Sequence, residues 1–556
     1  MKTKRLLLLA SSVVFATVAM FAQTPECDKV AKYHFPDNLQ EQIEALEHNP
    51  MLQQYATMRK ELDNQDRWRP DYHFSAPDGK LNDPNGLCFW QGRWHMFYQA
   101  NPVERDRKVQ YWGHAVSDDL IHWKDLPLAL YPDADDQKVY SGTTLVESDR
   151  VIAIHHTPKY GNYLAISSDP LLLNWERLEE PVVSVPTKGE NVPYKVFDPC
   201  IWKEGGYYYA LSGSKEEGIG KIRRPVEYLF RSKDLKEWTY MHPFVEHDQF
   251  FTSNDDGACP YFWPIGSTGK HILLSFSHYS GGHYLLGTYD TRRQKFEAYD
   301  GGGFNHGPTG RGGLHAPSAT PDPNSDGVVV IFNMKRGTVG RNGAGFNEIM
   351  TLPRLLSLDE YDQLVERPYG DYASLRGEYK SLTNFVVGAN EEVVLPGIEG
   401  NVAELVLEID MKKCRTLEVD ILRSPNKEEY TRIVVMREAG YPNTARTSKR
   451  KIRPSTIMLD ASCSSSSELV NTRQPDVVDF FLEKGEILKL HIFVDRSVVE
   501  VFANERRSLT MRAYPALDES RLVSIRPAGY PVEVVKAEVW QLGSIYEHKT
   551  AEKAGK

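Results

Sequence analysis

The sequence predicts an all-β protein in which a β-propeller is followed by a β-sandwich. Three observations lead to this prediction. From about residue 71 to 370, short apolar-aromatic runs alternate with clusters of Gly, Pro, Asp and Asn, as in strands joined by turns. A pattern of Ser, Asp and Trp recurs within the same region. From about 371 to 545, a second region alternates apolar and polar residues without helical periodicity, which is typical of antiparallel sheets.

The recurring pattern points to repeated sheets. It occurs at residues 117–123 and 232–238, with a degenerate copy at 168–175, and each copy follows a strand-like run. Strand-like runs in the first region include residues 94–98, 151–154, 207–211, 272–276 and 328–332. Repeated sheet units of this size are typical of a propeller, in which the tryptophans would pack between blades. Three copies do not fix the number of blades.

The ends of the chain carry other signals. Lys2, Lys4 and Arg5 precede an apolar run at 6–21 with the small Ala22 after it, so we interpret residues 1–22 as a signal peptide. The run is short for a membrane span, and no later segment is apolar for long enough. We therefore expect an exported protein, periplasmic or extracellular. Apolar residues recur at helical spacing within residues 23–70, which predicts a helical N-terminal extension. Residues 546–556 are expected to form a polar tail.

Composition excludes several functions. The net charge of −10 argues against nucleic-acid binding. The six cysteines form no Cys-x-x-Cys pair, which argues against a zinc or redox site. A metal at His278 and His283 would need partners that the sequence does not identify, so we expect neither a metal nor a cofactor.

Acidic residues precede three of the apolar runs. Asp83 and Asp198 each stand directly before Pro, and the pair Asp255-Asp256 stands shortly before Cys-Pro. By composition alone, the stretch 81–86 around Asp83 is a polar turn that feeds a buried strand. The inner strands of a propeller converge on a central funnel, so acids at the starts of successive inner strands would meet there.

These motifs resemble glycoside hydrolase family 32, the β-fructofuranosidases (invertases, inulinases and levanases). The resemblance covers roughly residues 71–545 and is most specific near the N-terminus. Its motifs are Asn-Asp-Pro-Asn-Gly at 82–86, Phe-Tyr-Gln-Ala-Asn-Pro at 97–102, Trp-Gly-His-Ala at 112–115, Tyr-Ser-Gly at 140–142 and Val-Asp-Arg-Ser at 494–497.

The resemblance implies a five-bladed propeller, an appended sandwich and a retaining double displacement on a carbohydrate substrate. Asp83 would be the nucleophile and Asp198 would stabilise the transition state, while a glutamate would act as acid/base. Asn82, Gln99, Trp112 and Ser141 would line the pocket for the fructosyl ring, with Trp112 as a flat apolar wall. His315, at the place of a family aromatic, would reach the pocket floor.

Two positions depart from the family pattern. Phe197 replaces the arginine that usually precedes the second aspartate, which removes a charged donor from the pocket. Ala258 replaces the acid/base glutamate before Cys-Pro, and alanine can neither donate nor accept a proton. Asp256 would face the same way as Ala258 along a strand, and a bulge near Gly257 could bring it to the funnel. Alternatives are Asp255, an acid from elsewhere (Glu246, Asp248 or Glu348), or none.

The leading hypothesis is therefore an exported glycosidase that cleaves β-fructofuranosides such as sucrose, fructo-oligosaccharides or fructan. Ala258 and Phe197 keep two alternatives open. One is a carbohydrate-binding pseudoenzyme that lacks the acid/base. The other is a related furanosidase, such as an arabinofuranosidase-like enzyme, because Phe197 should change which hydroxyl pattern the pocket accepts.

Overall fold

The chain is described by a computed structural model. The described residues are 30–546 except 78, 103–108, 247–249, 251–253, 268, 309–312, 336–348 and 441–451. The predicted signal peptide and the tail beyond residue 546 lie outside them. Within the described residues, no helix has the length and apolar character needed to cross a membrane.

The first domain consists of five sheets of four or five strands, almost entirely antiparallel. The strands of the first two sheets are β1 (Lys80–Trp90), β2 (Arg93–Asn101), β3 (Tyr111–Ser117), β4 (Lys124–Leu130), β5 (Gly142–Val146), β6 (Val151–Thr157), β7 (Gly161–Ser167), β8 (Glu176–Arg177) and β9 (Val183–Ser184). The third sheet contains β10 (Pro199–Glu204), β11 (Tyr207–Glu217), β12 (Arg223–Ser232) and β13 (Trp238–Pro243). The last two sheets contain β14 (Val245–Glu246), β15 (Ala258–Ile265), β16 (Lys270–Ser277), β17 (Gly281–Asp290), β18 (Lys295–Gly303), β19 (Leu314–Pro321), β20 (Val328–Met334), β21 (Ile349–Met350), β22 (Arg354–Leu358) and β23 (Leu364–Pro368).

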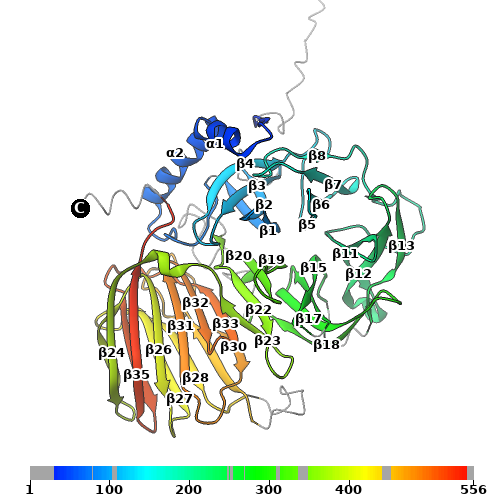
Figure 1. Cartoon of the computed structure of the whole chain (residues 1–556). Coiled ribbons are helices and arrows are strands. Elements are labelled where there is room, and N and C mark those ends of the chain that lie inside the picture. Colours follow the sequence, from blue (N-terminus) through cyan, green and yellow to red (C-terminus); the bar gives the residue numbers. More distant parts are fainter. Residues whose placement is uncertain are drawn as a thin grey trace, which may run out of the picture.

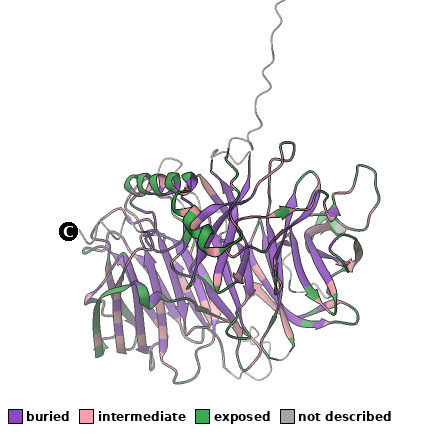
Figure 2. Cartoon of the chain, turned by 45° about the horizontal axis from the view of Figure 1, so that its top comes forward, coloured by how far each residue is buried: buried purple, intermediate pink, exposed green. Residues whose placement is uncertain are grey.

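These five sheets form a closed ring (Figure 1). Strands β1, β5, β10, β15 and β19, which we call the inner strands, contact one another in that order, and β19 contacts β1 again. Each pair of neighbouring sheets shares one buried apolar cluster. Most of their strands are buried on both faces (Figure 2), because each sheet packs between two others, whereas strands farther from the centre such as β13 and β18 are partly exposed. The ring therefore brings residues from distant parts of the chain to its centre.

The recurring Ser and Asp residues form matching turns at the outer edge of three sheets. In each, a serine hydroxyl donates to the aspartate two residues later, and the aspartate accepts backbone N–H groups of the turn. The pairs are Ser117–Asp119, Ser167–Asp169 and Ser232–Asp234. The degenerate copy therefore begins at Ser167 and has the same Ser-x-Asp spacing as the other two.

The second domain is a sandwich of two six-stranded sheets. One contains β24 (Arg376–Val387), β35 (Val532–Leu542), β26 (Val402–Asp410), β31 (Leu488–Asp495), β32 (Val498–Ala503) and β33 (Arg507–Arg512). The other contains β25 (Val393–Glu399), β34 (Leu522–Ala528), β27 (Thr416–Arg423), β28 (Thr431–Met436), β29 (Ser455–Asp460) and β30 (Asp476–Phe480). Apolar residues that alternate along these strands meet in one core between the sheets.

Buried ionic contacts join the ring to the sandwich. Arg354 of β22 is fully buried and donates to Glu500 of β32 at 2.7 Å. His73 lies between two sandwich carboxylates, with Nδ1 2.8 Å from Asp495 Oδ2 and Nε2 3.1 Å from Glu500 Oε1. Because breaking such a pair leaves a buried charge uncompensated, these contacts fix the two domains to each other.

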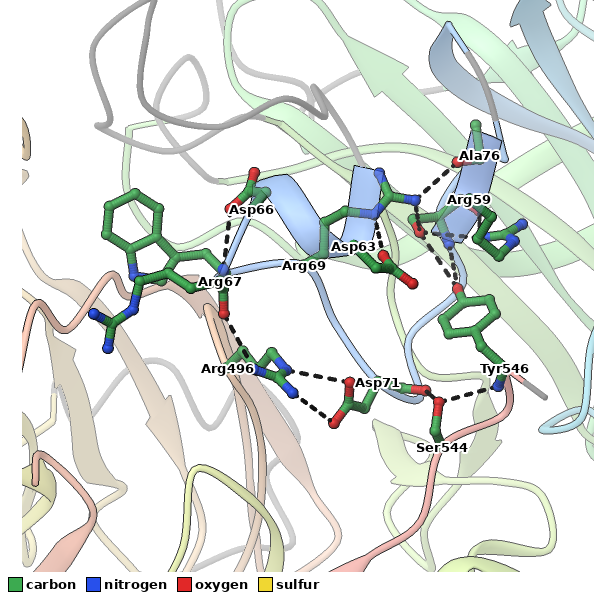
Figure 3. A network of polar contacts seen from close by, with 12 residues as sticks. Arg59, Asp63, Asp66, Arg67, Arg69, Asp71, Ala76, Arg496, Ser544 and Tyr546 are labelled. Atoms are coloured by element: carbon green, nitrogen blue, oxygen red, sulfur yellow. Dashed lines mark hydrogen bonds and ion pairs between the residues drawn. The ribbon is translucent and has the colours of Figure 1, made fainter. Parts of the chain in front are cut away.

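The predicted N-terminal extension contains helices α1 (Leu39–Glu47) and α2 (Pro50–Gln65). Outside the extension, two short 3₁₀ turns occur, η2 (Ile219–Lys221) in the first domain and η3 (Tyr372–Leu375) before β24. Polar contacts hold the segment after α2 against the C-terminal part of the chain (Figure 3). Arg496 donates to both carboxylate oxygens of Asp71 at 3.2 Å, and Ser544 donates to the Asp71 carbonyl at 2.8 Å. Arg69 donates to Asp63 at 2.6 Å. Arg59 of α2 donates to Asp125 of β4 at 2.7 Å, and Arg67 donates to the Ala516 carbonyl of the second domain at 3.0 Å, so the extension contacts both domains.

Candidate active site

Asp83 lies within inner strand β1 and not in a turn. The pairing of β1 with β2 is interrupted between Leu81 and Pro84, on either side of Asp83. A second irregularity follows Asn85, where Gly86 has a φ of 52° and an added Cβ would lie 2.7 Å from the Thr144 methyl group of β5. The turn predicted from composition is therefore wrong. The Pro-Asn-Gly residues instead form bulges that aim a strand carboxylate at the ring centre.

A chain of hydrogen bonds surrounds the Asp83 carboxylate. Ser141, just before β5, donates to Asp83 Oδ2 at 2.9 Å and accepts from the Gln99 amide at 2.7 Å. Asn82 donates to Gln99 Oε1 at 2.7 Å. On the other side, His315 Nδ1 of β19 lies 3.3 Å from Asp83 Oδ1. The structure thus brings together four of the predicted binding residues around Asp83: Asn82, Gln99, Ser141 and His315.

Asp198 lies directly before β10 and beside Asp83. Its Oδ2 accepts the backbone N–H of Cys259 at 3.2 Å. The Cys259 sulfur lies 3.5 Å from Asp198 Oδ2 and 3.9 Å from Asp83 Oδ2, so the two carboxyl groups flank one thiol. Both aspartates are buried, at 7% and 5% exposure for Asp83 and Asp198.

The two carboxyl groups differ in protonation. Burial and the neighbouring Asp83 charge raise the pKa of Asp198 to about 7. Burial alone would also raise the pKa of Asp83, but the hydrogen bond and charge of His315, together with Lys335 and Ser141, hold it well below its usual range. Asp83 is therefore ionised while Asp198 keeps its proton up to near neutral pH. Neighbouring carboxyls whose pKa values are pushed apart are a common feature of catalytic sites.

A pocket of about 420 Å³ opens at β15. Phe197 and Ala258, which precede Asp198 and Cys259 in the chain, line it, whereas Asp83 and Asp198 are not among its lining residues. Asp256, His278 and Lys215 also line it. Asp256 Oδ2 lies 3.1 Å from His278 Nδ1 and 3.4 Å from Lys215 Nζ. Although burial would raise the pKa of Asp256, the hydrogen bond and charge of His278 lower it, so Asp256 is ionised. The bulge anticipated near Gly257 lies just beyond it, between Ala258 and Tyr261, where Cys259 has a φ of 47°.

The two departures from the family pattern contact one apolar cluster. Ala258 and Cys259 pack with Phe276 and Ala316, and Phe197 packs against them. Phe197 also lines the pocket. The polar residues expected at 197 and 258 are thus replaced together by side chains that share an apolar contact, so the pocket has an apolar wall at this place.

The other candidate acids lie elsewhere. Asp255 accepts from the hydroxyls of Ser277 and Ser280 at 2.8 and 2.7 Å, and it does not line the pocket. Glu246 lies on the edge strand β14 and forms an ion pair with Arg293. Asp248 and Glu348 lie outside the described residues. Among the described candidates, only Asp256 shares the pocket with Ala258.

Trp112 does not line a sugar site. Its side chain has no exposed surface, its indole N–H donates to the Tyr140 carbonyl at 2.9 Å, and its ring stacks on Phe97 with centroids 5.7 Å apart. An added Cβ at Gly86 would lie 3.5 Å from the Trp112 ring, so the indole packs behind β1. Trp112 supports the Asp83 strand from the core and presents no wall to a ligand.

Sequence reasoning missed three polar residues of the site. Lys335 donates to Asn82 Oδ1 at 3.0 Å and lies at the end of β20, where no motif marked it. Lys215 lies near the C-terminal end of β11. His278 was considered only together with His283, although antiparallel pairing of the runs at 258–265 and 270–277 would have placed it opposite Asp256. Within the described residues, no group of three His, Cys, Asp or Glu side chains could hold a metal ion.

Comparisons with known proteins agree with this geometry. A family model described as the glycosyl hydrolases family 32 N-terminal domain matches residues 73–368, and the model of the family 32 C-terminal domain matches residues 371–541. The chain is 26% identical over 548 residues to an insoluble β-fructofuranosidase isoenzyme of Arabidopsis thaliana, covering 85% of this chain and 90% of the relative. It is 25% identical over 486 residues to a levanase of Bacillus subtilis, covering 80% and 65%.

Solved structures show the same fold. The fructan 1-exohydrolase IIa of Cichorium intybus superposes with a TM-score of 0.72 at 19% identity, and the match covers 86% of this chain and 98% of that one. An exo-inulinase of Aspergillus awamori gives a TM-score of 0.67 at 20% identity, covering 86% and 99%. The arrangement of ring and sandwich is thus common to these proteins.

Proposed function

The chain belongs to glycosyl hydrolase family 32 and is a glycosidase, and on that premise we propose that it hydrolyses β-fructofuranosides by a retaining double displacement. Membership of the family supports the substrate class, sucrose or fructan. One observation carries the mechanism: an ionised Asp83, held by Ser141 and His315, lies beside an Asp198 whose pKa is raised to about 7. The five sheets would be the five blades of a propeller, and residues 1–22 would direct export.

In this proposal Asp83 attacks the anomeric carbon of the fructosyl group. Its depressed pKa keeps it ionised at neutral pH. Asp198 would hydrogen-bond the sugar hydroxyls and, because it holds its proton near neutral pH, could donate as well as accept. Ser141, Asn82 and Gln99 would bind further hydroxyls from the same side.

The leaving group also needs a proton. Ala258 stands where the family's acid/base glutamate would be, so the proton must come from another group in the pocket. Asp256 is the described candidate that lines the pocket together with Ala258. Because His278 and Lys215 keep it ionised, we assign it the role of holding a proton donor and not of donating directly.

The test is turnover by the purified chain. Sucrose, inulin and levan should release fructose, and Asp83→Asn should abolish the release. Asp322→Asn is a matched control, since Asp322 is equally buried but accepts from Tyr369 and Ser325 away from the pocket. Full activity of Asp83→Asn would show that the nucleophile is another residue. Calorimetric binding of sugars without any product would favour the pseudoenzyme.

A second candidate is a furanosidase of altered specificity. It is supported by Phe197, which gives the pocket an apolar wall where the family pattern has a cationic donor. A screen of fructosides against arabinofuranosides separates the two. Exclusive release of arabinose would favour this second activity.

A further inference from the structure

Asp256 and His278 lie on the same face of the β15–β16 pair as Ala258. Ala258 pairs with Phe276 across the antiparallel strands β15 and β16. Side chains alternate along strands, so the residues two positions outward, Asp256 and His278, share that face and lie opposite each other. The contacts agree: the His278 backbone N–H donates to Asp256 Oδ1 at 3.0 Å, and its Nδ1 lies 3.1 Å from Asp256 Oδ2. Both residues line the pocket with Ala258.

We propose that His278, oriented by Asp256, replaces the missing glutamate as the general acid and base of this glycosidase. The inference deepens the proposed function and rests on it. Asp256 engages Nδ1 of the imidazole, which leaves Nε2 for the substrate. A carboxylate that fixes one ring nitrogen of a histidine sets its orientation and stabilises the charged ring.

Accessibility distinguishes the two residues. The Asp256 side chain is 8% exposed and is bonded to His278 and Lys215, whereas the His278 side chain is 53% exposed and can reach a ligand in the pocket. His278 is also close to the histidine that contacts the nucleophile. Its ring centroid is 6.3 Å from that of His315, and His315 Nδ1 is 3.3 Å from Asp83.

Charges around His278 favour its protonated form. The bond to Asp256 raises its pKa, and the charges of Asp256, Asp83 and Asp198 add to this effect against partial burial. Lys215 and His315 also face His278. Lys215 Nζ lies 3.4 Å from Asp256 Oδ2, so Asp256 pairs with a lysine as well as with His278. A histidine whose pKa lies above its ordinary value of 6.5 can deliver a proton at neutral pH and take it back.

The two steps then balance. In the first, an Asp83 oxygen forms a bond to the anomeric carbon, the bond from that carbon to the leaving oxygen breaks, and this oxygen keeps the electron pair and takes the proton from His278 Nε2. In the second, water attacks the same carbon, its proton passes to His278 Nε2, and the electron pair of the broken ester bond returns to Asp83. Fructose is released and both residues regain their starting states.

The experiment compares two substrates that need protonation to different degrees. The leaving group of sucrose is a poorly stabilised glucose alkoxide. The leaving group of p-nitrophenyl β-D-fructofuranoside is a stable phenolate. In His278→Gln, kcat for sucrose should fall by about 10²–10⁴-fold, the usual contribution of general acid–base catalysis. The chromogenic substrate should give a burst followed by slow turnover, and sodium azide should accelerate this turnover by replacing water.

A pH profile supplies the second readout. Activity should require protonated His278, so kcat/KM should be lost as pH rises through a pKa above 6.5. Asp256→Asn removes the carboxylate that raises this pKa, so the alkaline limb should move to lower pH. His242→Gln is the matched control, since His242 lies on β13 outside the pocket and its ring contacts the backbone oxygens of Pro243 and Arg293. Thermal unfolding verifies that each variant folds.

The outcomes separate the inference from the function. If the wild type cleaves fructosides and His278→Gln loses both substrates equally, without azide rescue, or loses neither, then His278 is not the acid/base and the proposed function stands. If the wild type cleaves no fructoside, the proposed function falls and this inference falls with it. Asp83→Asn should lose both substrates, and azide should not restore them.

Discussion

Replacing Asp198 by Asn should make the protein more stable at pH 8 while removing activity. Asp198 has a pKa of about 7 in the folded chain, against an ordinary value of 3.8. Below pH 3.8 both the folded and unfolded states hold the proton, so the group has no effect on stability. Between the two pKa values only the folded state keeps it, and the free energy of unfolding falls as pH rises. Above pH 7 the loss is complete.

The magnitude follows from the difference in proton affinity. Each tenfold change in proton binding corresponds to about 1.4 kcal/mol, so the folded state loses up to about 4 kcal/mol by pH 8. Asparagine keeps an oxygen that can accept the Cys259 N–H, and it carries no charge. In a domain of this size, recovering that free energy should raise the melting temperature by about 4–8 °C.

Differential scanning calorimetry of the full chain at pH 4.5 and pH 8 tests this expectation. Asp198→Asn should gain stability at pH 8 and gain much less at pH 4.5. Asp83→Asn provides a contrast, since the pKa of Asp83 is lowered and its ionised form stabilises the folded state at neutral pH. That variant should be less stable than the wild type at pH 8. A melting temperature of Asp198→Asn at or below that of the wild type at pH 8 would refute the assignment of two differently protonated carboxyls.

Two further predictions concern the pocket and the domain contact. Adding Ala258→Glu to His278→Gln should recover part of the lost sucrose turnover, because a carboxyl would return to the face that lines the pocket; steady-state kinetics of the double variant measure it. Glu500→Gln should lower the free energy of unfolding by about 3–5 kcal/mol, because it removes the nearer of the two buried carboxylates that pair with Arg354 (Glu500 at 2.7 Å, Glu366 at 3.3 Å) and one of the two that flank His73; calorimetry at pH 7 measures it.

Matched variants give these predictions their controls. Ala258→Gln in the same background adds similar bulk without an ionisable group and should not restore turnover, so equal recovery by both would contradict a role for proton transfer. Glu533→Gln removes the exposed ion pair with Lys412, whose side chains are 37% and 49% exposed. It should change stability by less than about 1 kcal/mol. If Glu500→Gln also lowers the free energy of unfolding by less than about 1 kcal/mol, the ionic contact between the domains does not contribute strongly to stability.

Much of the fold could be predicted because its signals are local. Alternating residues such as those of β26 identify a strand with one buried face, and the Ser-x-Asp turns mark the outer edges of three sheets. Around Asp83 the signals are also local, since Asn82, Gln99 and Ser141 each belong to a short motif. These three residues could be placed together because the inner strands of neighbouring sheets contact one another at the centre of the ring.

The rest depended on packing between distant segments. The exposure of Trp112 could not be derived from its motif, because it is set by Phe97 and by the close approach that Gly86 allows between β1 and β5. The pairing of Asp256 with His278 depends on the register of β15 and on the bulge after Ala258. A one-residue change in that register would have placed the histidine on the opposite face.

The central claim is that Asp83 forms a covalent bond to the substrate, and trapping the intermediate tests it most directly. His278→Gln, incubated with p-nitrophenyl β-D-fructofuranoside and quenched in acid, should accumulate a fructosyl ester because its hydrolysis lacks a base. Digestion and mass spectrometry should then find one fructosyl group on the peptide that contains Asp83, and none in Asp83→Asn. A fructosyl group on a different residue, or product formation without any adduct, would contradict the account.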